Sequence, residues 1–234
     1  MSAVEDIVFL LDVDNTLLDN DHVVTDLKKY LDREVGPESC RRYFTIFEQL
    51  RAEVGYADYL GALQRYRSST RHDPHLLKVS SFLVDYPFAN RLYPGSLDAI
   101  EHLRQWGSTV ILSDGDVVFQ PLKVQRSGLW DAVEGRVLIY VHKEEMLDDV
   151  RQRHPARHYV LVDDKLRILT ATKKIWKHEL TTIFPRQGHY AHDAEIIAVN
   201  PPADITLDAI RDVVSYDLPA LLSGEAMEGT LHRS

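Results

Sequence analysis

A single stretch near the start of the chain most constrains the fold. Ile7 to Leu11 is a run of five apolar residues that ends directly in Asp12-Val13-Asp14. Such a run is typical of a strand that is buried on both faces of a parallel sheet. Open α/β sheets bind their ligands at the carboxyl ends of such strands. The sequence therefore predicts a functional site at Asp12 and Asp14.

Two carboxylates at one strand end repel each other, and their burial is unfavourable unless a cation lies between them. Oxygen ligands suit Mg²⁺, and a carboxylate beside Mg²⁺ can attack phosphorus to form an aspartyl-phosphate. The alternative is a simple turn in which Asp14, Asn15 or Thr16 caps the following helix.

Composition narrows the class of protein. The 234 residues allow one large domain or a core with an inserted lobe. The net charge of -9 argues against nucleic-acid binding. Cys40 is the only cysteine, so an internal disulfide is impossible, which fits a cytoplasmic protein. The first residues do not resemble a signal peptide, and no apolar run reaches the ~18 residues that span a membrane.

Helical patterns fill residues 20–90, and no strand pattern interrupts them. The expected helices cover Val23–Glu34, a segment around Tyr43–Val54, Ala57–Tyr66 and His75–Val84, the last with Pro74 near its start. A helical block between two strand-rich parts predicts an inserted lobe. The expected domains are residues 1–19 with 91–234 as the core, and 20–90 as the lobe.

Strands and helices then alternate, which predicts a mostly parallel sheet covered on both faces. A turn at Tyr93-Pro94-Gly95 leads to Ser96, an expected helix cap. The expected strands are Thr109–Leu112, Val137–Val141, Tyr159–Val162, Thr181–Phe184 and Ile196–Val199. The expected helices are Ser96–Trp106, Val117–Arg126, Glu144–Arg153, one from the acidic pair Asp163-Asp164 to about Lys177, and Thr206–Ser215.

Polar residues follow several of these strands. Ser113, Lys143 and the pair Asp163-Asp164 each come after an apolar run, as Asp12 does. Because the carboxyl ends of parallel strands lie at one edge, these groups should meet. A carboxylate nucleophile, a divalent ion and donors for phosphoryl oxygens are what phosphoryl transfer requires.

In this order, the motifs resemble the haloacid dehalogenase (HAD) superfamily. The resemblance covers Ile7 to about Phe184, and residues 20–90 lie where that family inserts a helical cap. It implies a Rossmann-like, three-layer α/β/α core with a helical cap, Mg²⁺ as cofactor and hydrolase activity.

The resemblance also implies roles for individual residues. Asp12 would be the nucleophile, and Asp14 would protonate the leaving oxygen, activate water and bind Mg²⁺ through its carbonyl. Asp164 would be the main acidic metal ligand and Asp163 a more indirect one. Ser113 and Lys143 would hold the phosphoryl oxygens, with Asp114 and Gly115 beside them. Lys123, in mid-helix, and Lys165, directly after the acids, are rivals of Lys143.

Asp14 separates the two chemistries of this superfamily. The dehalogenase branch needs neither Mg²⁺ nor an acid at this position, so Asp14 favours hydrolysis of a phosphate monoester. A 2-haloacid dehalogenase and a non-catalytic phosphate-binding protein are the alternatives. The lobe should exclude macromolecules and select a small phosphorylated metabolite. Tyr56 and Arg65 are candidate substrate contacts, although such tyrosines often serve only helix packing. Both a monomer and a homodimer fit the sequence.

Overall fold

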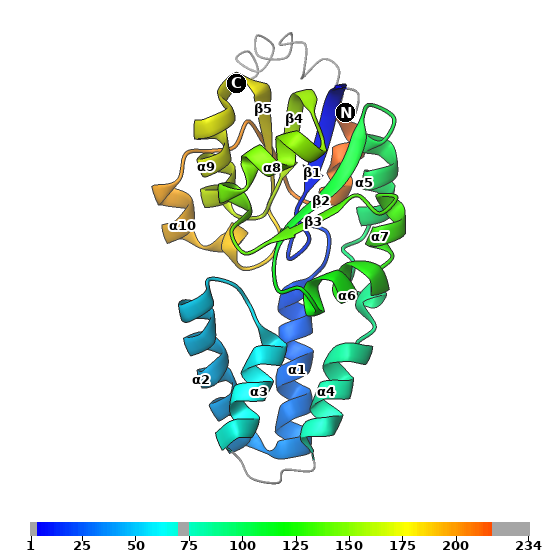
Figure 1. Ribbon diagram of the computed structural model, residues 1–234. Coiled ribbons are helices and arrows are strands. Elements are labelled where there is room, and N and C mark those ends of the chain that lie inside the picture. Colours follow the sequence, from blue (N-terminus) through cyan, green and yellow to red (C-terminus); the bar gives the residue numbers. More distant parts are fainter. Residues whose placement is uncertain (1–3, 70–74, 217–234) are drawn as a thin grey trace.

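A six-stranded, fully parallel sheet forms the centre of the upper part of the molecule in Figure 1. The computed structural model describes residues 4–69 and 75–216. The strand order is β3-β2-β1-β4-β5-β6, which places β1 and β4 in the middle. The strands are β1 (Glu5–Leu11), β2 (Ser108–Asp114), β3 (Val137–Tyr140), β4 (Ala156–Val162), β5 (Leu180–Pro185) and β6 (Ile205–Leu207).

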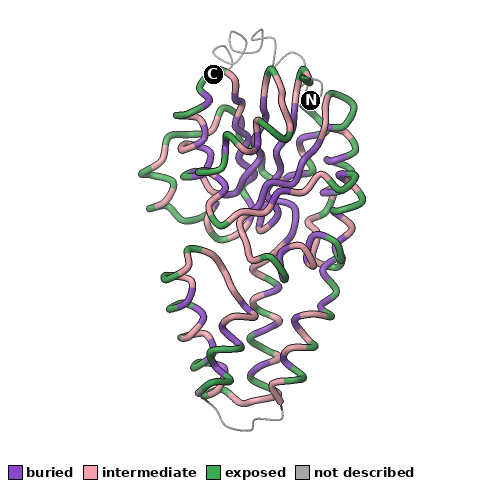
Figure 2. The backbone as a smooth tube through the Cα atoms, viewed as in Figure 1, coloured by how far each residue is buried: buried purple, intermediate pink, exposed green. Residues whose placement is uncertain are grey.

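Both faces of β1 are buried, as the apolar run predicts. Phe9 and Leu11 join one hydrophobic cluster, whereas Val8 and Leu10 join a second one on the opposite face. Successive side chains of a strand point to opposite faces, so the two clusters lie on the two sides of the sheet. Figure 2 shows the buried residues concentrated along these central strands. The predicted three-layer α/β/α core is confirmed.

Helices from both halves of the chain cover the sheet. The first cluster includes residues of α5 (Ser96–Leu103), α6 (Phe119–Arg126), α7 (Leu129–Ala132) and the 3₁₀ helix η5 (Ile210–Ser215). The second includes residues of α8 (Leu147–Arg153) and α9 (Leu166–Trp176). Shorter elements are the 3₁₀ helices η1 (Phe88–Arg91), η2 (Lys143–Glu145), η3 (Lys177–Glu179) and η4 (Tyr190–His192), and α10 (Ala194–Val199).

Four helices between β1 and β2 form a separate bundle, called here the helical lobe (Figure 1). They are α1 (Asn20–Val35), α2 (Pro37–Val54), α3 (Tyr59–Ser69) and α4 (Leu76–Asp85). The chain enters the lobe after Leu18 and leaves it before Leu92, and these two residues pair in an antiparallel bridge. The domain boundaries themselves stay a prediction. No helix in the described part of the chain is long and apolar enough to cross a membrane.

Three local predictions are wrong. Ile196–Val199 is helical, because the Asp193 side chain accepts hydrogen bonds from the amides of Glu195 and Ile196 and so begins α10. The expected helix over Thr206–Ser215 is β6 followed by η5. Ser96 does not cap α5: its hydroxyl donates to the Leu17 carbonyl (2.8 Å) instead. Pro74 lies outside the described residues.

Candidate active site

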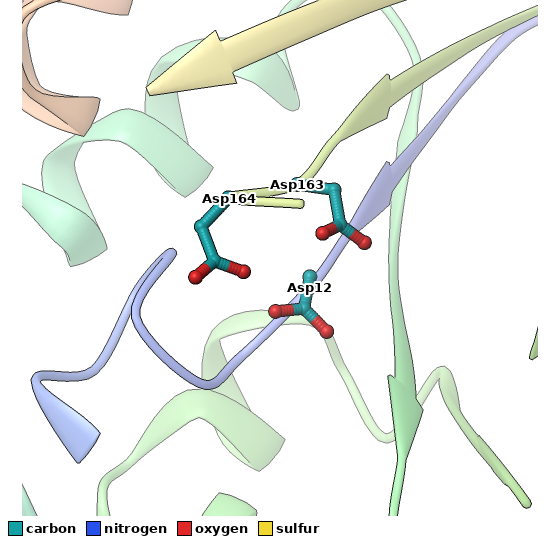
Figure 3. Close-up of side chains that lie close together, drawn as sticks. All are labelled: Asp12, Asp163 and Asp164. Atoms are coloured by element: carbon teal, nitrogen blue, oxygen red, sulfur yellow. The ribbon is translucent and has the colours of Figure 1, made fainter. Parts of the chain in front are cut away.

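Three carboxylates meet where β1 and β4 end (Figure 3). Leu11 is in register with Val162, so Asp12 emerges beside Asp163 and Asp164. One oxygen from each of the three groups lies within 4.8 Å of the others, and all three residues are buried. The structure therefore brings together the carboxylates that the sequence predicts as metal ligands.

The positive charge around this buried cluster is too small to balance its three carboxylates. Neither oxygen of Asp164 has a hydrogen-bond partner among the described residues. Burial raises the pKa of Asp163 to about 6 and that of Asp164 well above its usual value. A buried carboxylate without a partner is unfavourable, and a divalent cation would remove the penalty. The oxygen-only donor set fits Mg²⁺.

Among the described residues, Lys143 supplies the one ammonium in direct contact with this cluster. Its Nζ donates to Asp12 Oδ1, lies 2.7 Å from Asp163 Oδ2 and reaches the Leu112 carbonyl at 3.2 Å. Burial alone would lower the pKa of Lys143, but Asp12, Asp163 and Asp114 together raise it. Lys143 is therefore charged at neutral pH, and it fixes one oxygen of Asp12.

Thr16 holds the other oxygen of Asp12. Its hydroxyl donates to Asp12 Oδ2 (3.3 Å) and accepts from the Asp164 amide (3.0 Å). The turn that returns Thr16 to the strand end needs a left-handed residue, and Asn15 adopts φ 60° there. The Asp12 side chain is thus fixed on both sides, which leaves little freedom in its direction.

The end of β2 adds a hydroxyl and a glycine to the site. Ser113 Oγ accepts from Gln120 Nε2 (3.0 Å), and Asp114 Oδ1 accepts from the Lys143 amide (2.8 Å). Asp114 therefore holds the Lys143 backbone. A Cβ at Gly115 would lie 2.6 Å from Gln120 Cβ, so glycine is required for this packing.

Asp14 does not join the three-carboxylate cluster and instead has an ammonium partner. Lys123 Nζ donates to both oxygens of Asp14 (2.7 and 2.9 Å) and to Asn20 Oδ1 (3.1 Å). Lys123 is fully buried, whereas Asp14 keeps some exposure toward a cavity. Lys123 is thus a site residue, although the sequence offers it only as a rival of Lys143. The spacing of Gln120 and Lys123, three residues apart on one helix face, is the signal that could have indicated it.

A cavity of about 870 Å³ lies between the strand ends and the helical lobe. Asp14, Asp114, Gly115, Lys123 and Lys165 line it from the core. The lobe contributes Phe44, Phe47, Arg51, Tyr56 and Tyr59, so Tyr56 lies where the sequence predicts it. Arg65 is not among the lining residues: its guanidinium pairs with Glu53 on the exposed side of the lobe (2.6 and 3.0 Å).

A segment of the core, residues 186–200, closes the cavity from a third side. His189 bonds to Asp21 through its amide (2.9 Å) and its ring (2.7 Å). Tyr190 Oη accepts from Arg51 Nη2 at 2.5 Å. The sequence alone indicates no role for this segment, and its histidines, His189 and His192, match no metal-binding spacing.

Comparisons with known proteins find one matching family and several similar solved structures. The family described as haloacid dehalogenase-like hydrolase matches residues 8–188. A solved structure of a haloacid dehalogenase-like hydrolase from Burkholderia xenovorans LB400 is 65% identical, with a TM-score of 0.87 over 91% of this chain and 99% of its own. No curated protein matches the chain.

Two more distant structures share the fold. YfnB, a HAD-hydrolase from Bacillus subtilis bound to magnesium, is 17% identical, with a TM-score of 0.58 over 93% of this chain and 99% of its own. An L-2-haloacid dehalogenase from Xanthobacter autotrophicus is 18% identical, with a TM-score of 0.58 over 96% and 100%. The fold is thus shared by a magnesium-bound hydrolase and by a dehalogenase.

Proposed function

Because the chain belongs to the haloacid dehalogenase-like hydrolases, we propose that it is a Mg²⁺-dependent phosphatase acting on a small phosphate monoester. The observation that carries this proposal is Asp164, which lies beside Asp12 and Asp163 and whose two buried oxygens have no hydrogen-bond partner in the described part of the chain. Such a cluster needs a divalent cation. The displacement of halide from carbon, in contrast, does not require a metal ion.

Asp12, Asp164 and the Asp14 carbonyl would hold the ion, with Asp163 close by. When bound, Mg²⁺ supplies positive charge for the phosphoryl oxygens and for the carboxylates around them. Lys143 and Ser113 would bind the remaining phosphoryl oxygens. Lys143 already contacts Asp12, so the nucleophile and the phosphoryl group would share this ammonium.

The reaction would take two steps. In the first, an oxygen of Asp12 attacks phosphorus, the bond from phosphorus to the ester oxygen breaks, and Asp14 gives a proton to the leaving alkoxide. In the second, Asp14 takes a proton from water, and the resulting hydroxide displaces phosphate from Asp12. Lys123 donates to both oxygens of Asp14 and so holds this carboxyl group in position for both steps.

The helical lobe would act as the cap over this site. It closes the cavity against bulk water, which favours a small substrate over a macromolecule. The Asp14–Lys123 pair and Tyr56 lie on that cavity, where an ester group would leave.

The test is hydrolysis of p-nitrophenyl phosphate with Mg²⁺ and with excess EDTA. We expect phosphate release only with Mg²⁺, and a loss of at least ~10³-fold in Asp12→Asn, because the amide cannot act as nucleophile. Beryllium fluoride with Mg²⁺ should form its adduct on Asp12. Halide release from a 2-haloacid in EDTA would instead establish the dehalogenase alternative, and an adduct on another residue would contradict the assignment.

A further inference from the structure

The cavity carries positive charge that the proposed chemistry does not use. Arg51, from α2, and Lys165, directly after the acidic pair, both line it. Both contact Tyr190: Arg51 Nη2 donates to the Tyr190 hydroxyl at 2.5 Å, and Lys165 Nζ lies 5.7 Å from the centre of the Tyr190 ring. Two cations from opposite sides of the cavity thus meet at one tyrosine.

Three of the four carboxylates that line the cavity have partners other than Arg51 and Lys165. Asp14 pairs with Lys123, Asp21 accepts from His189, and Asp114 accepts from the Lys143 amide. The fourth, Glu48, is exposed and lies 3.7 Å from Arg51. Within the described part of the chain, no carboxylate comes within 4.0 Å of Lys165 Nζ, so Arg51 and Lys165 hold unused donors.

The acidic cluster does not require Lys165 once a divalent ion is present. Asp12, Asp163 and Asp164 carry three negative charges, which Lys143 and one divalent ion together balance. Lys165 lines the cavity from the core side, and Arg51 lines it from the lobe side.

We propose that Arg51, Tyr190 and Lys165 form a second anion subsite, so that the substrate is a phosphate monoester bearing a further carboxylate or phosphate. A guanidinium, an ammonium and a phenol hydroxyl are donors suited to either group. Tyr190 can accept from Arg51 and still donate its own proton to the anion. This inference rests on the proposed phosphatase function and specifies its substrate class.

The subsite also gives a role to residues 186–200, the core segment that closes the cavity from a third side. Arg51 belongs to the lobe, whereas Tyr190 and Lys165 belong to the core. An anion bound between them joins both halves of the molecule, and this would favour the closed arrangement when the correct substrate is present. A substrate without the second anion loses that contribution.

The test compares matched substrates. In the first pair, 3-phosphoglycerate has a carboxylate where glycerol 3-phosphate has a hydroxymethyl group. In the second pair, fructose 1,6-bisphosphate has a second phosphate that fructose 6-phosphate lacks. We expect kcat/KM to favour the doubly anionic member of at least one pair by about tenfold or more. The pair that shows the preference identifies the anion.

Arg51→Gln should lower kcat/KM for that doubly anionic substrate by about tenfold to a hundredfold. Tyr190→Phe, which keeps the ring, should lower it less. Both changes should lower kcat/KM for glycerol 3-phosphate and p-nitrophenyl phosphate by a smaller factor than for the doubly anionic substrate. Arg41→Gln, an exposed position on the same helix, is the matched control and should have no effect. Circular dichroism checks that each variant folds.

Calorimetric binding separates this inference from the proposed function. In the Asp12→Asn variant, 3-phosphoglycerate or fructose 1,6-bisphosphate should bind more tightly than its partner, and Arg51→Gln should remove the difference. This result would support the subsite even if no ester were hydrolysed. Equal affinities within both pairs, or an equal loss in Arg51→Gln for all substrates, would overturn it, since the Arg51–Tyr190 contact would then serve only to hold lobe and core together.

Discussion

At the scale of single residues, the Asp14–Lys123 pair is the least expected part of the site. Asp14 has the position of an acid and base, yet it is held by a fully buried ammonium that also contacts Asn20. Lys123 does not reach the three-carboxylate cluster, so it acts through Asp14 and is best described as a positioning residue.

Lys123→Met should therefore lower kcat for p-nitrophenyl phosphate by about tenfold to a hundredfold, with a smaller change in KM. The reason is that Asp14 loses the donors that fix its direction, which are worth ~1.5–3 kcal/mol for a charged hydrogen bond. Lys123→Arg keeps the charge and should recover part of the rate. Equal activity in Lys123→Met and the unmodified protein would remove Lys123 from the mechanism.

The sequence predicts residues at strand ends well and residues on helices poorly. Asp12, Ser113 and Asp163 follow directly from apolar runs, because the end of a buried strand fixes where the next residue lies. Lys123 lies inside α6, and a helical position alone does not say which neighbour its side chain meets. Arg65 illustrates the same limit, since its partner on the lobe surface is Glu53.

At the scale of elements, three buried carboxylates repel one another at the ends of β1 and β4. This repulsion opposes folding, and the other contacts of the fold have to outweigh it. The folded-state pKa of Asp163, about 6, lies above the value near 4 of an unfolded aspartate, and Asp164 shifts in the same direction. Between these values the folded protein binds more protons than the unfolded chain does. Without metal, stability should therefore fall as the pH rises from about 4 to about 6 and beyond.

Saturating Mg²⁺ should reverse this loss. At about 100 times its Kd, a ligand adds ~2.7 kcal/mol, which corresponds to a rise in Tm on the order of 5–10 °C for a chain of this length. We expect a larger rise at pH 7.5 than at pH 5, because protons compete with the metal. Differential scanning fluorimetry measures both. Asp164→Asn should greatly reduce the rise, and an unchanged rise in this variant would place the ion elsewhere.

The short elements α10 and β6 are the ones that the sequence predicts least well. Ile196 to Val199 is an apolar run of strand length, and only the capping by Asp193 makes it helical. β6 has three residues and depends on pairing with Ile183, Phe184 and Pro185 of β5. A local sequence pattern does not predict pairing with a distant strand. The longer strands are predicted because each has a run of apolar residues of its own.

At the scale of the whole molecule, one hydrophobic cluster crosses from the sheet into the helical lobe. It includes Phe9 and Ile111 of the sheet together with Leu27 and Leu83 of the lobe. Phe119 lies at the crossing, because its ring packs against Tyr59 and Phe88, with ring centres 5.3 and 5.6 Å away. The lobe and the sheet should therefore unfold together.

Phe119→Ala should weaken this coupling. The loss of a buried ring of this size typically costs about 3–5 kcal/mol, and calorimetry should then resolve two transitions instead of one. Val117→Ala, at a highly exposed position two residues earlier, is the control and should change stability by less than ~0.5 kcal/mol. A single, unshifted transition in Phe119→Ala would show that other contacts couple the two parts.

The bridge between Leu18 and Leu92 sets how the two parts can move. Since both connections of the lobe pass this point, a rigid rotation of the lobe has its axis there, and displacement grows with distance from that axis. Asn20 is two residues away and would travel little, so its contact with Lys123 would persist. Arg51, near the C-terminal end of α2, contacts Tyr190 of the core, so a swing of the lobe away from the core would break the Arg51–Tyr190 contact. The bridge would thus keep the Asp14 side of the cavity fixed while the proposed Arg51–Tyr190 side opens.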